Sequence, residues 1–338
     1  MVTLILDCYG GDHSPKANVD GALKVLEETS DLNLLLVGDE KGIASELQNK
    51  KYDSSRCHIV DAPEVIDCHE APSLAVFHRK NSSLVRSLDL LKDNQADGMV
   101  SLGNSGALLV GGVVKIGKIE GVTRPAFCPL VPTMDGSFCA ICDSGASSEA
   151  NAQEILQYAL MGSLYLEKAF GRKSPRVALL NIGTEEGKGD PIHQEAYQLL
   201  KACPSLNFVG NMEGRDLTSG AYDLVVADGF SGNILLKSTE GMGLALLKLL
   251  KKSFYKNVKN KMGALLLKKD IYEIKDFMDY NNYGGAVMLG LKKTLVKAHG
   301  GGDERHVFHS LLQAYTLEKN QLSEAIRSSL ASLQEAQK

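Results

Sequence analysis

Short apolar runs rich in leucine and β-branched residues alternate with longer segments of helical periodicity along most of the chain. The runs that favour β-strands are residues 2–6, 32–37, 59–60, 99–101, 138–142, 177–182, 208–209 and 224–227. Several of these runs are apolar throughout, which is typical of strands covered by helices on both faces. The alternation predicts an α/β protein built from parallel βαβ units.

The length of 338 residues allows either two domains or one large α/β unit. The sequence contains no internal repeat, no low-complexity tract and no proline- and serine-rich linker that would divide it. We therefore expect a single α/β unit over residues 1–338.

Charge and composition exclude several classes of function. The 37 lysines and arginines stand against 41 aspartates and glutamates, so the net charge is −4 and no overall positive field attracts nucleic acid. The chain has no tryptophan and only 6% aromatic residues, which argues against a stacking platform for single strands or sugars. We expect no nucleic-acid partner.

The cysteines and the uncharged stretches favour a cytoplasmic protein. The seven cysteines are odd in number and scattered, unlike the framework of a secreted disulfide-rich domain. Residues 98–114 carry no charge, but they are too rich in glycine and polar side chains to cross a bilayer. The first residues contain no basic leader of the signal-peptide kind.

Glycine-rich turns follow most of the predicted strands, for example at residues 7–12, 103–106, 181–183 and 228–233. In doubly wound sheets, ligands bind beyond the carboxyl ends of the strands, where backbone N–H groups of such turns can bind anions. Residues 103–106 are thus a candidate phosphate site. The alternative is a βα corner in which Ser105 only caps a helix.

Two familiar nucleotide-binding signatures are absent from the sequence. No G-x-G-x-x-G follows a predicted strand, and residues 183–189 are one residue short of a P-loop and lack its Ser or Thr. Lys188 in that segment is either a cation that the flanking glycines leave open to a ligand or an ordinary surface lysine. His306 and His309 lie three apart on a predicted helix, and we expect both on its exposed face.

Residues 244–269 carry eight lysines and no acidic residue, with leucines and other apolar side chains between them. One interpretation is a long amphipathic helix with a solvated lysine face. The other is a docking surface for anionic lipid or for an acidic partner protein. The two interpretations are compatible.

Eight blocks of sequence, in order along the chain, carry a family resemblance. They are LDCYGGD (6–12), SLGNSGA (101–107), QYALMG (157–162), LLNIGTEEGKG (179–189), FVGNMEGRD (208–216), DGFSGN (228–233), YGGA (283–286) and AHG (298–300). Together they resemble the PlsX-type phosphate acyltransferases, which convert acyl-(acyl carrier protein) and inorganic phosphate into acyl phosphate for phospholipid synthesis.

The resemblance implies a three-layer α/β/α, Rossmann-like fold similar to isocitrate and isopropylmalate dehydrogenases, with a cleft between two lobes. It implies a homodimer, a helical excursion over residues 236–282 and peripheral membrane contact through residues 244–269. The implied partners are acyl carrier protein, inorganic phosphate and a downstream glycerol-3-phosphate acyltransferase. No metal and no cofactor are expected.

Acyl transfer to phosphate needs the nucleophile held near the thioester carbon and donors aimed at the developing oxyanion. The candidate catalytic residues are Lys188, Asn181, His299 and Asn233. The candidates for binding phosphate or substrate are Gly10, Gly11, Asp12, Gly103, Asn104, Ser105, Gly106, Asn211, Arg215, Asp228 and Gly229. We expect residues 103–106 and Lys188 to hold phosphate, and the asparagines to donate to phosphate or to the carbonyl. His299 would position or protonate the thiolate. Ionised Asp12 and Asp228 can only accept hydrogen bonds, so we expect them to orient cationic side chains or backbone turns.

The chain departs from the family pattern at four positions. Asn151 stands where the pattern D-x-G-A-N-x-D-x-K-P has lysine, Ser147 where it has asparagine, Ser105 where threonine is common, and Gly302 in place of the serine of H-G-x-S. Three alternatives stay open: a diverged relative that uses another acyl thioester carrier, a non-catalytic protein that binds carrier or membrane, and a dehydrogenase of the related fold. No nicotinamide-binding or metal-binding pattern favours the last.

Overall fold

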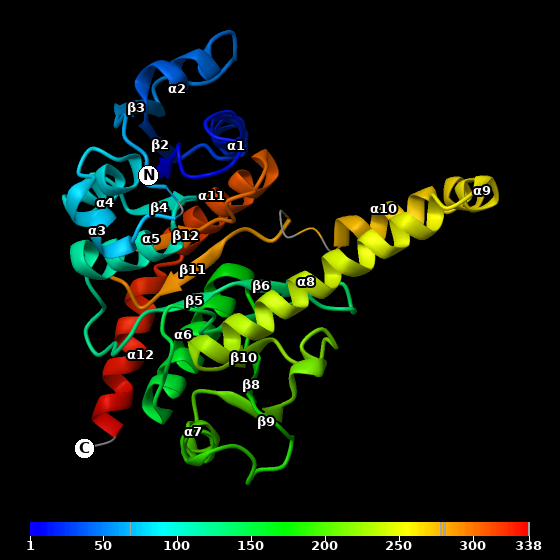
Figure 1. Ribbon diagram of the computed structural model, residues 1–338. Helices are drawn as coiled ribbons and strands as arrows, with labels where there is room; N and C mark the ends of the chain where they lie inside the picture. The colour runs from blue at the N-terminus through cyan, green and yellow to red at the C-terminus, as the bar shows by residue number, and fades with distance from the viewer. Residues whose placement is uncertain (68, 278, 280–281, 337–338) are drawn as a thin grey trace.

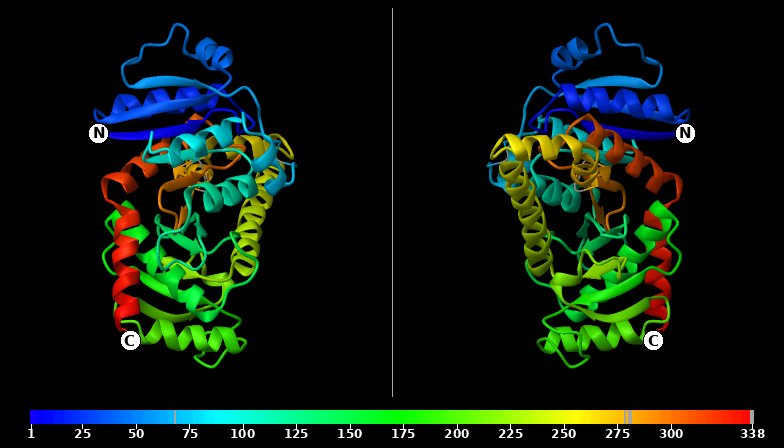
Figure 2. Two further views of the ribbon diagram at one scale, coloured as in Figure 1. Left: turned by 90° about the vertical axis from the view of Figure 1, so that its left-hand side faces the viewer. Right: turned by 90° about the vertical axis from the view of Figure 1, so that its right-hand side faces the viewer.

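The computed structural model describes residues 1–67, 69–277, 279 and 282–336, whose strands form two sheets (Figure 1). The seven-stranded sheet has the order β3-β2-β1-β4-β12-β11-β5, and the five-stranded sheet has the order β6-β7-β10-β8-β9. The strands are β1 (Val2–Asp7), β2 (Leu32–Gly38), β3 (Cys57–Asp61), β4 (Gly98–Ser101), β5 (Ala126–Cys128), β6 (Leu130–Pro132), β7 (Phe138–Cys142), β8 (Arg176–Leu180), β9 (Asn207–Met212), β10 (Leu224–Val226), β11 (Ala286–Leu289) and β12 (Thr294–Lys297). Each sheet defines one lobe, and Figure 2 shows the two lobes at opposite ends of the molecule.

All eight predicted strands are confirmed, and parallel pairing dominates both sheets. The antiparallel pairs are β11 with β12, β11 with β5, and β6 with β7. Each of these pairs includes short strands of three or four residues that the sequence pattern did not predict.

Helices cover both faces of each sheet. The helices are α1 (Lys16–Glu28), α2 (Glu40–Leu47), α3 (Pro72–His78), α4 (Ser83–Lys92), α5 (Ser105–Gly111), α6 (Ala152–Phe170), α7 (Pro191–Ala202), α8 (Gly229–Phe254), α9 (Val258–Leu266), α10 (Lys268–Phe277), α11 (Glu304–Lys319) and α12 (Leu322–Ala336), with a π-helical turn at Gly112–Ile116 and a 3-10 turn at Gly214–Asp216. Successive residues of a strand point to opposite faces, so Leu4 and Leu6 pack with the core under α1 and α11, whereas Ile5 packs with the core under α4.

The second sheet is covered in the same way. Leu179 of β8 belongs to the core under α6 and α7, whereas Ala178 faces a smaller cluster that includes Leu235 of α8. The predicted three-layer α/β/α fold with two lobes is confirmed.

Helix α8 begins just after strand β10, at the carboxyl edge of the second sheet, and projects away from the two lobes. Helices α9 and α10 return beside its far end (Figure 1). We call residues 244–269 of this projection the arm. The arm is helical except for short turns, as the lysine-rich pattern predicts. In the part of the chain that the structure describes, no helix is long and apolar enough to span a membrane.

Candidate active site

The predicted glycine-rich turns of the first lobe meet at the carboxyl edge of its sheet. The turn after β1 lies against the turn after β4, because a Cβ added to Gly10 would lie 2.3 Å from the backbone nitrogen of Gly103. The turn after β12 joins them, since the backbone N–H of Asp12 donates to the carbonyl of Gly300 at 2.8 Å. Only glycine at position 10 permits this approach of two backbones.

Three polar side chains form a row across the same edge. β4 lies between β1 and β12, and the parallel register pairs Ser101 with Asp7 on one side and with Lys297 on the other. The Ser101 hydroxyl donates to Asp7 Oδ2 at 2.7 Å, and the Gly103 N–H donates to Ser101 Oγ at 3.1 Å. Lys297 Nζ donates to the carbonyl of Leu102 at 3.3 Å and to that of Ala298. Asp7 and Ser101 are buried, and Lys297 is partly buried.

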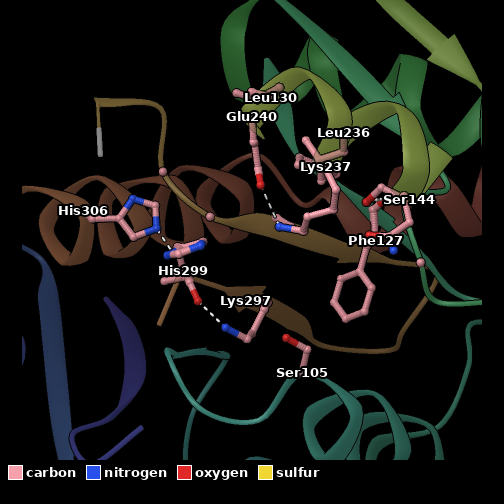
Figure 3. Close-up of a pocket in the computed structure, with 17 residues that line it drawn as sticks. Ser105, Phe127, Leu130, Ser144, Leu236, Lys237, Glu240, Lys297, His299 and His306 are labelled. Atoms are coloured by element: carbon pink, nitrogen blue, oxygen red, sulfur yellow. Dashed lines mark hydrogen bonds and ion pairs between the residues drawn. The ribbon is translucent and has the colours of Figure 1, made fainter. Parts of the chain in front are cut away.

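A cavity of about 250 Å³ opens between the lobes beside this row (Figure 3). The first lobe contributes Ser105, Lys297 and His299, and the second contributes Ser144 and Gly145 from the loop after β7. Helix α8 contributes Asn233, Leu236, Lys237 and Glu240, and the remaining lining residues are Phe127, Pro129, Leu130, Gly284, Gly285, Ala286, Ala298 and His306. The expected cleft between two lobes is thus present.

The walls of the cavity differ in chemical character. Ser105, Lys297 and His299 lie on one side of it, and Leu130 and Leu236 lie across from them beside Lys237 and Glu240 (Figure 3). Phe127 lies near Ser105, and Pro129 completes the apolar lining. Of its two lysines, Lys237 forms an ion pair with Glu240 at 2.8 Å. Within the described part of the chain, no ion pair involves Lys297. Loss of hydration lowers the pKa of Lys297 to about 8, although the carboxylate of Asp7 opposes the shift.

Two histidines line the cavity in different roles. His299 Nδ1 accepts from the Gly301 N–H at 3.1 Å, so in the neutral ring the proton is on Nε2, which can then donate. Loss of hydration, Lys237 and Lys297 all lower the pKa of His299, which keeps the ring neutral at pH 7. His306 Nε2 accepts from the His299 backbone N–H at 2.8 Å, and burial lowers the pKa of His306 to about 4.

The expectation that His306 lies on an exposed helix face is wrong. Its side chain is only 2% exposed, because α11 turns it toward the His299 turn and the cavity. His309, one helical turn on, is partly exposed. A spacing of three residues leaves open which side of the helix faces the protein, so the sequence could not decide this point.

The loop after β7 is built around one carboxylate. Asp143 accepts from the backbone N–H groups of Phe127, Ser144, Gly145, Ala146 and Ser147 at 2.7–3.2 Å. Burial raises the pKa of Asp143, whereas these N–H donors act in the opposite direction. The carboxylate therefore fixes the shape of the wall that carries Ser144 and Gly145.

Helix α8 starts against the same loop. Asp228 is the N-cap residue, its carboxylate accepting from the Ser231 N–H at 2.9 Å. A Cβ on Gly229 would lie 2.0 Å from the Ser147 carbonyl oxygen. The candidates Asp228 and Gly229 thus position α8, and through it Asn233, rather than line the cavity themselves.

The candidates Asn181, Asn211 and Lys188 form a separate group at the edge of the second sheet. The Asn181 amide donates to Asn211 Oδ1 and to the Lys188 carbonyl, both at 3.1 Å, and the Asn211 amide donates to the Glu185 carbonyl at 2.7 Å. Both asparagines therefore shape the 181–189 loop. Lys188 Nζ lies 3.9 Å from Glu185 Oε2, with its side chain 47% exposed. None of the three lines the cavity.

Two further candidates have local partners of their own. Asn104 is the N-cap of α5, accepting from the Ala107 N–H at 3.0 Å, while its amide donates to the carbonyls of Asp67 and Glu70. Arg215 pairs with Glu213 and lies at a second, open hollow on the other side of α8, which includes Leu235 and Met242.

The substituted positions 151 and 147 also have structural partners. Asn151 is the N-cap of α6 and forms a capping box with Glu154, in which each side chain accepts from the other's backbone N–H at 2.9 Å. The Ser147 hydroxyl contacts Asp143 Oδ2 at 3.3 Å and the Tyr158 hydroxyl at 3.4 Å.

Five residues that line the cavity were not among the predicted site residues, namely Lys297, Lys237, Glu240, Ser144 and His306. The available signal for Lys297 was its place directly before the AHG block. The others depend on which face of a helix or loop meets the cleft.

Solved structures of two phosphotransacylases have a similar fold. A phosphotransacetylase from Streptococcus pyogenes superposes with a TM-score of 0.62 at 16% identity, covering 94% of each chain. A branched-chain phosphotransacylase from Enterococcus faecalis gives a TM-score of 0.58 at 14% identity, covering 94% of this chain and 99% of that one. At these identities the likeness establishes the fold.

Sequence comparison establishes the family. The model of the fatty acid synthesis protein family matches residues 2–325. A phosphate acyltransferase of Bacillus pumilus is 43% identical over 323 residues, covering 96% of both chains, and one of Clostridioides difficile is 37% identical over 335 residues, covering 99% of this chain and 98% of that one. The chain belongs to the fatty acid synthesis protein family of phosphate acyltransferases. The resemblance seen in the eight sequence blocks is confirmed, and the chain is an enzyme of the acyltransferase class.

Proposed function

We propose that this enzyme transfers the acyl group of acyl-(acyl carrier protein) to inorganic phosphate, giving acyl phosphate and the free carrier thiol. The observation that carries the proposal is the cavity between the lobes, where a lysine without an ion-pair partner among the described residues and a neutral histidine lie across from Leu130 and Leu236. An anion and the carbonyl end of an apolar acyl chain fit such a pair of walls.

The chemistry needs positioning more than an activated protein nucleophile. A phosphate oxygen attacks the thioester carbonyl carbon, a tetrahedral oxyanion forms, and the C–O bond replaces the C–S bond as the thiolate leaves. A cysteine-like thiol has a pKa of about 8.5, so the thiolate is a fair leaving group near neutral pH. Preorganised donors at the oxyanion supply the main acceleration.

The side chains at the cavity suit these tasks. The Nε2–H of neutral His299 is a donor for the oxyanion or the departing thiolate, and its backbone is held by His306. Asn233 and Ser105 add donors on either side. We propose that the turn of Gly103 and Gly106 contacts phosphate from the first lobe.

We propose that Lys188 binds the substrate from the second lobe. Lys188→Ala should lower acyl phosphate formation by at least about tenfold with the fold intact, because a cation proposed to hold the substrate is lost. The measurement is turnover at saturating phosphate. Unchanged turnover would remove Lys188 from the reaction. The control is Lys201→Ala on nearby α7, which removes an ion pair with Glu186 of the 181–189 loop.

We further propose a cytoplasmic homodimer that touches the membrane through the arm and passes its product to a glycerol-3-phosphate acyltransferase. The arm exposes apolar side chains beside its lysines, a combination suited to an anionic lipid surface. The most exposed are Leu244, Leu249, Tyr255, Val258, Met262, Leu265 and Leu266. Light scattering tests the dimer, which should have twice the 36.4 kDa mass of one chain.

Vesicle flotation tests the membrane contact. The protein should float with vesicles containing phosphatidylglycerol, less with pure phosphatidylcholine, and less again in high salt, because salt screens the lysines. Leu266→Glu should weaken flotation, since the Leu266 side chain is 87% exposed and plays no part in the core. Recovery of all protein in the vesicle-free fraction would exclude the membrane role.

The experiment that tests the proposed function mixes purified protein, palmitoyl-(acyl carrier protein) and phosphate, and traps acyl phosphate with hydroxylamine. Phosphate-dependent hydroxamate with matching release of carrier thiol is expected. No hydroxamate with carrier or coenzyme A thioesters would favour a binding protein that has lost catalysis.

A further inference from the structure

We propose that Lys297 is the residue that binds the phosphate nucleophile, and that Asp7 and Ser101 are positioning residues that hold its ammonium at the cavity. The inference rests on the proposed function only in taking phosphate as the co-substrate. It names the phosphate subsite, which the sequence had assigned to Lys188 and the 103–106 turn.

The distribution of charge in the cavity singles out Lys297. The charge of Lys237 is balanced by Glu240 at 2.8 Å, so this pair offers an anion little net attraction. The ammonium of Lys297 donates to the neutral carbonyls of Leu102 and Ala298, and within the described residues no carboxylate forms an ion pair with it. Its positive charge therefore remains available to an anion that enters the cavity.

The sheet register places Asp7 and Ser101 beside Lys297. Asp7, Ser101 and Lys297 stand side by side on neighbouring parallel strands, so their side chains project from one face at one edge. Asp7 is fixed by the Ser101 hydroxyl at 2.7 Å and the Tyr9 N–H at 3.3 Å, while the Asn18 amide donates to its backbone carbonyl at 3.0 Å. Buried Asp7 is therefore too confined to reach into the cavity, but its charge favours the protonated form of Lys297.

The position of Lys297 also suits the reaction. It lies with Ser105 and His299 across the cavity from Leu130 and Leu236 (Figure 3). A phosphate bound there would present an oxygen toward a thioester lying against these two leucines. Lys188, by contrast, lies outside the cavity and is half exposed, where water weakens its attraction for an anion.

Direct binding of inorganic phosphate tests the assignment without relying on catalysis. Titration calorimetry would compare the wild-type chain with Lys297→Met and Lys293→Met. Lys293 is the matched control because it directly precedes the first residue of the same strand, and its ammonium donates to the carbonyl of Ala96 at 3.3 Å. Lys297→Met should weaken phosphate binding about 10- to 100-fold, the worth of one charge-assisted hydrogen bond. Lys293→Met should bind as the wild type does.

Asp7→Asn tests the positioning role through a pH profile. Without the carboxylate, the ammonium loses its proton at lower pH, so the pH at which phosphate affinity begins to fall should shift downward. A residue that only supported the fold would leave this midpoint in place. An unchanged midpoint would therefore remove Asp7 from the proposal.

The outcomes separate this inference from the proposed function. The inference is overturned if Lys297→Met binds phosphate like the wild type, even if acyl phosphate forms. It is also overturned if the wild type binds no phosphate at tens of millimolar. If Lys297→Met loses phosphate binding but the wild type forms no acyl phosphate, the phosphate subsite stands and the proposed reaction is rejected. If Lys297→Met does not fold, Lys297→Gln and Lys297→Arg replace it, with arginine expected to retain the larger share of the affinity.

Discussion

Asp143→Ala is expected to lower the free energy of unfolding by at least about 3 kcal/mol, because it leaves several buried N–H groups without an acceptor. The carboxylate accepts from Phe127 of the first sheet and from four consecutive residues of the loop after β7. No neighbouring backbone carbonyl can replace it without a rearrangement of the loop. The activity should fall with the stability, since Ser144 and Gly145 line the cavity.

Urea unfolding followed by circular dichroism measures the effect, with Asp135→Ala as the control. Asp135 also accepts from a side chain and a backbone N–H, those of Thr133 and Ser137, but it lies in an exposed turn. It leaves only two donors, of which the Ser137 N–H lies in the exposed turn, so its removal should cost less, about 1 to 2 kcal/mol. Similar losses for the two variants would contradict the structural role of Asp143.

Phosphate affinity is expected to be nearly constant between pH 7 and 8 and to fall about tenfold for each pH unit above that, if Lys297 binds phosphate as an ammonium. The sign follows from the lowered pKa. A lysine with a pKa of about 8 is charged below that pH and neutral above it, so the attraction disappears as the pH rises. Bound phosphate stabilises the ammonium and raises its pKa in the complex, so the fall should begin near the pKa of the free enzyme and level off above the pKa of the complex.

The other titrating groups around Lys297 do not produce the same profile. Asp7 from β1 and Glu240 from α8 are carboxylic acids, and Lys237 from α8 is paired with Glu240. The pKa values of His299 and His306 are lowered, so both rings are neutral from pH 7 to 10. The measurement is the dissociation constant of inorganic phosphate from pH 7 to 10. An affinity that stays level to pH 10 would show that no such lysine holds the phosphate.

The sequence predicted the parts of this fold whose signals are local. The strand runs are strongly apolar, and the turns that follow β1 and β4 carry glycine at Gly10 and Gly103 because the two backbones nearly touch. Such a turn is visible in a single sequence, and so is the expectation that neighbouring parallel strands bring their turns together.

What the sequence could not predict depends on pairing across the sheet. β12 has only four residues and pairs with β4, almost two hundred residues earlier in the chain, so the approach of Lys297 to Ser101 and Asp7 leaves no local pattern. The same reason hides His306, whose orientation is set by the packing of α11. The register that makes the row is a property of the folded sheet.

The second-lobe candidates illustrate a different limit. Asparagine at strand ends is a good hydrogen-bond donor, so Asn181 and Asn211 were reasonable candidates for binding substrate. In the structure their amides are bonded to each other and to the 181–189 loop. Residue type reveals that an amide can donate, but only the fold reveals which acceptor it meets.

The most direct test of the central claim uses phosphate labelled with oxygen-18 on all four oxygens. The protein would be incubated with palmitoyl-(acyl carrier protein), and the product would be identified by mass spectrometry. If phosphate is the nucleophile, acyl phosphate should appear with all four labelled oxygens, because the attacking oxygen becomes the bridge to the acyl carbon. Unlabelled fatty acid as the sole product would mean that water attacks the thioester, and would contradict the account.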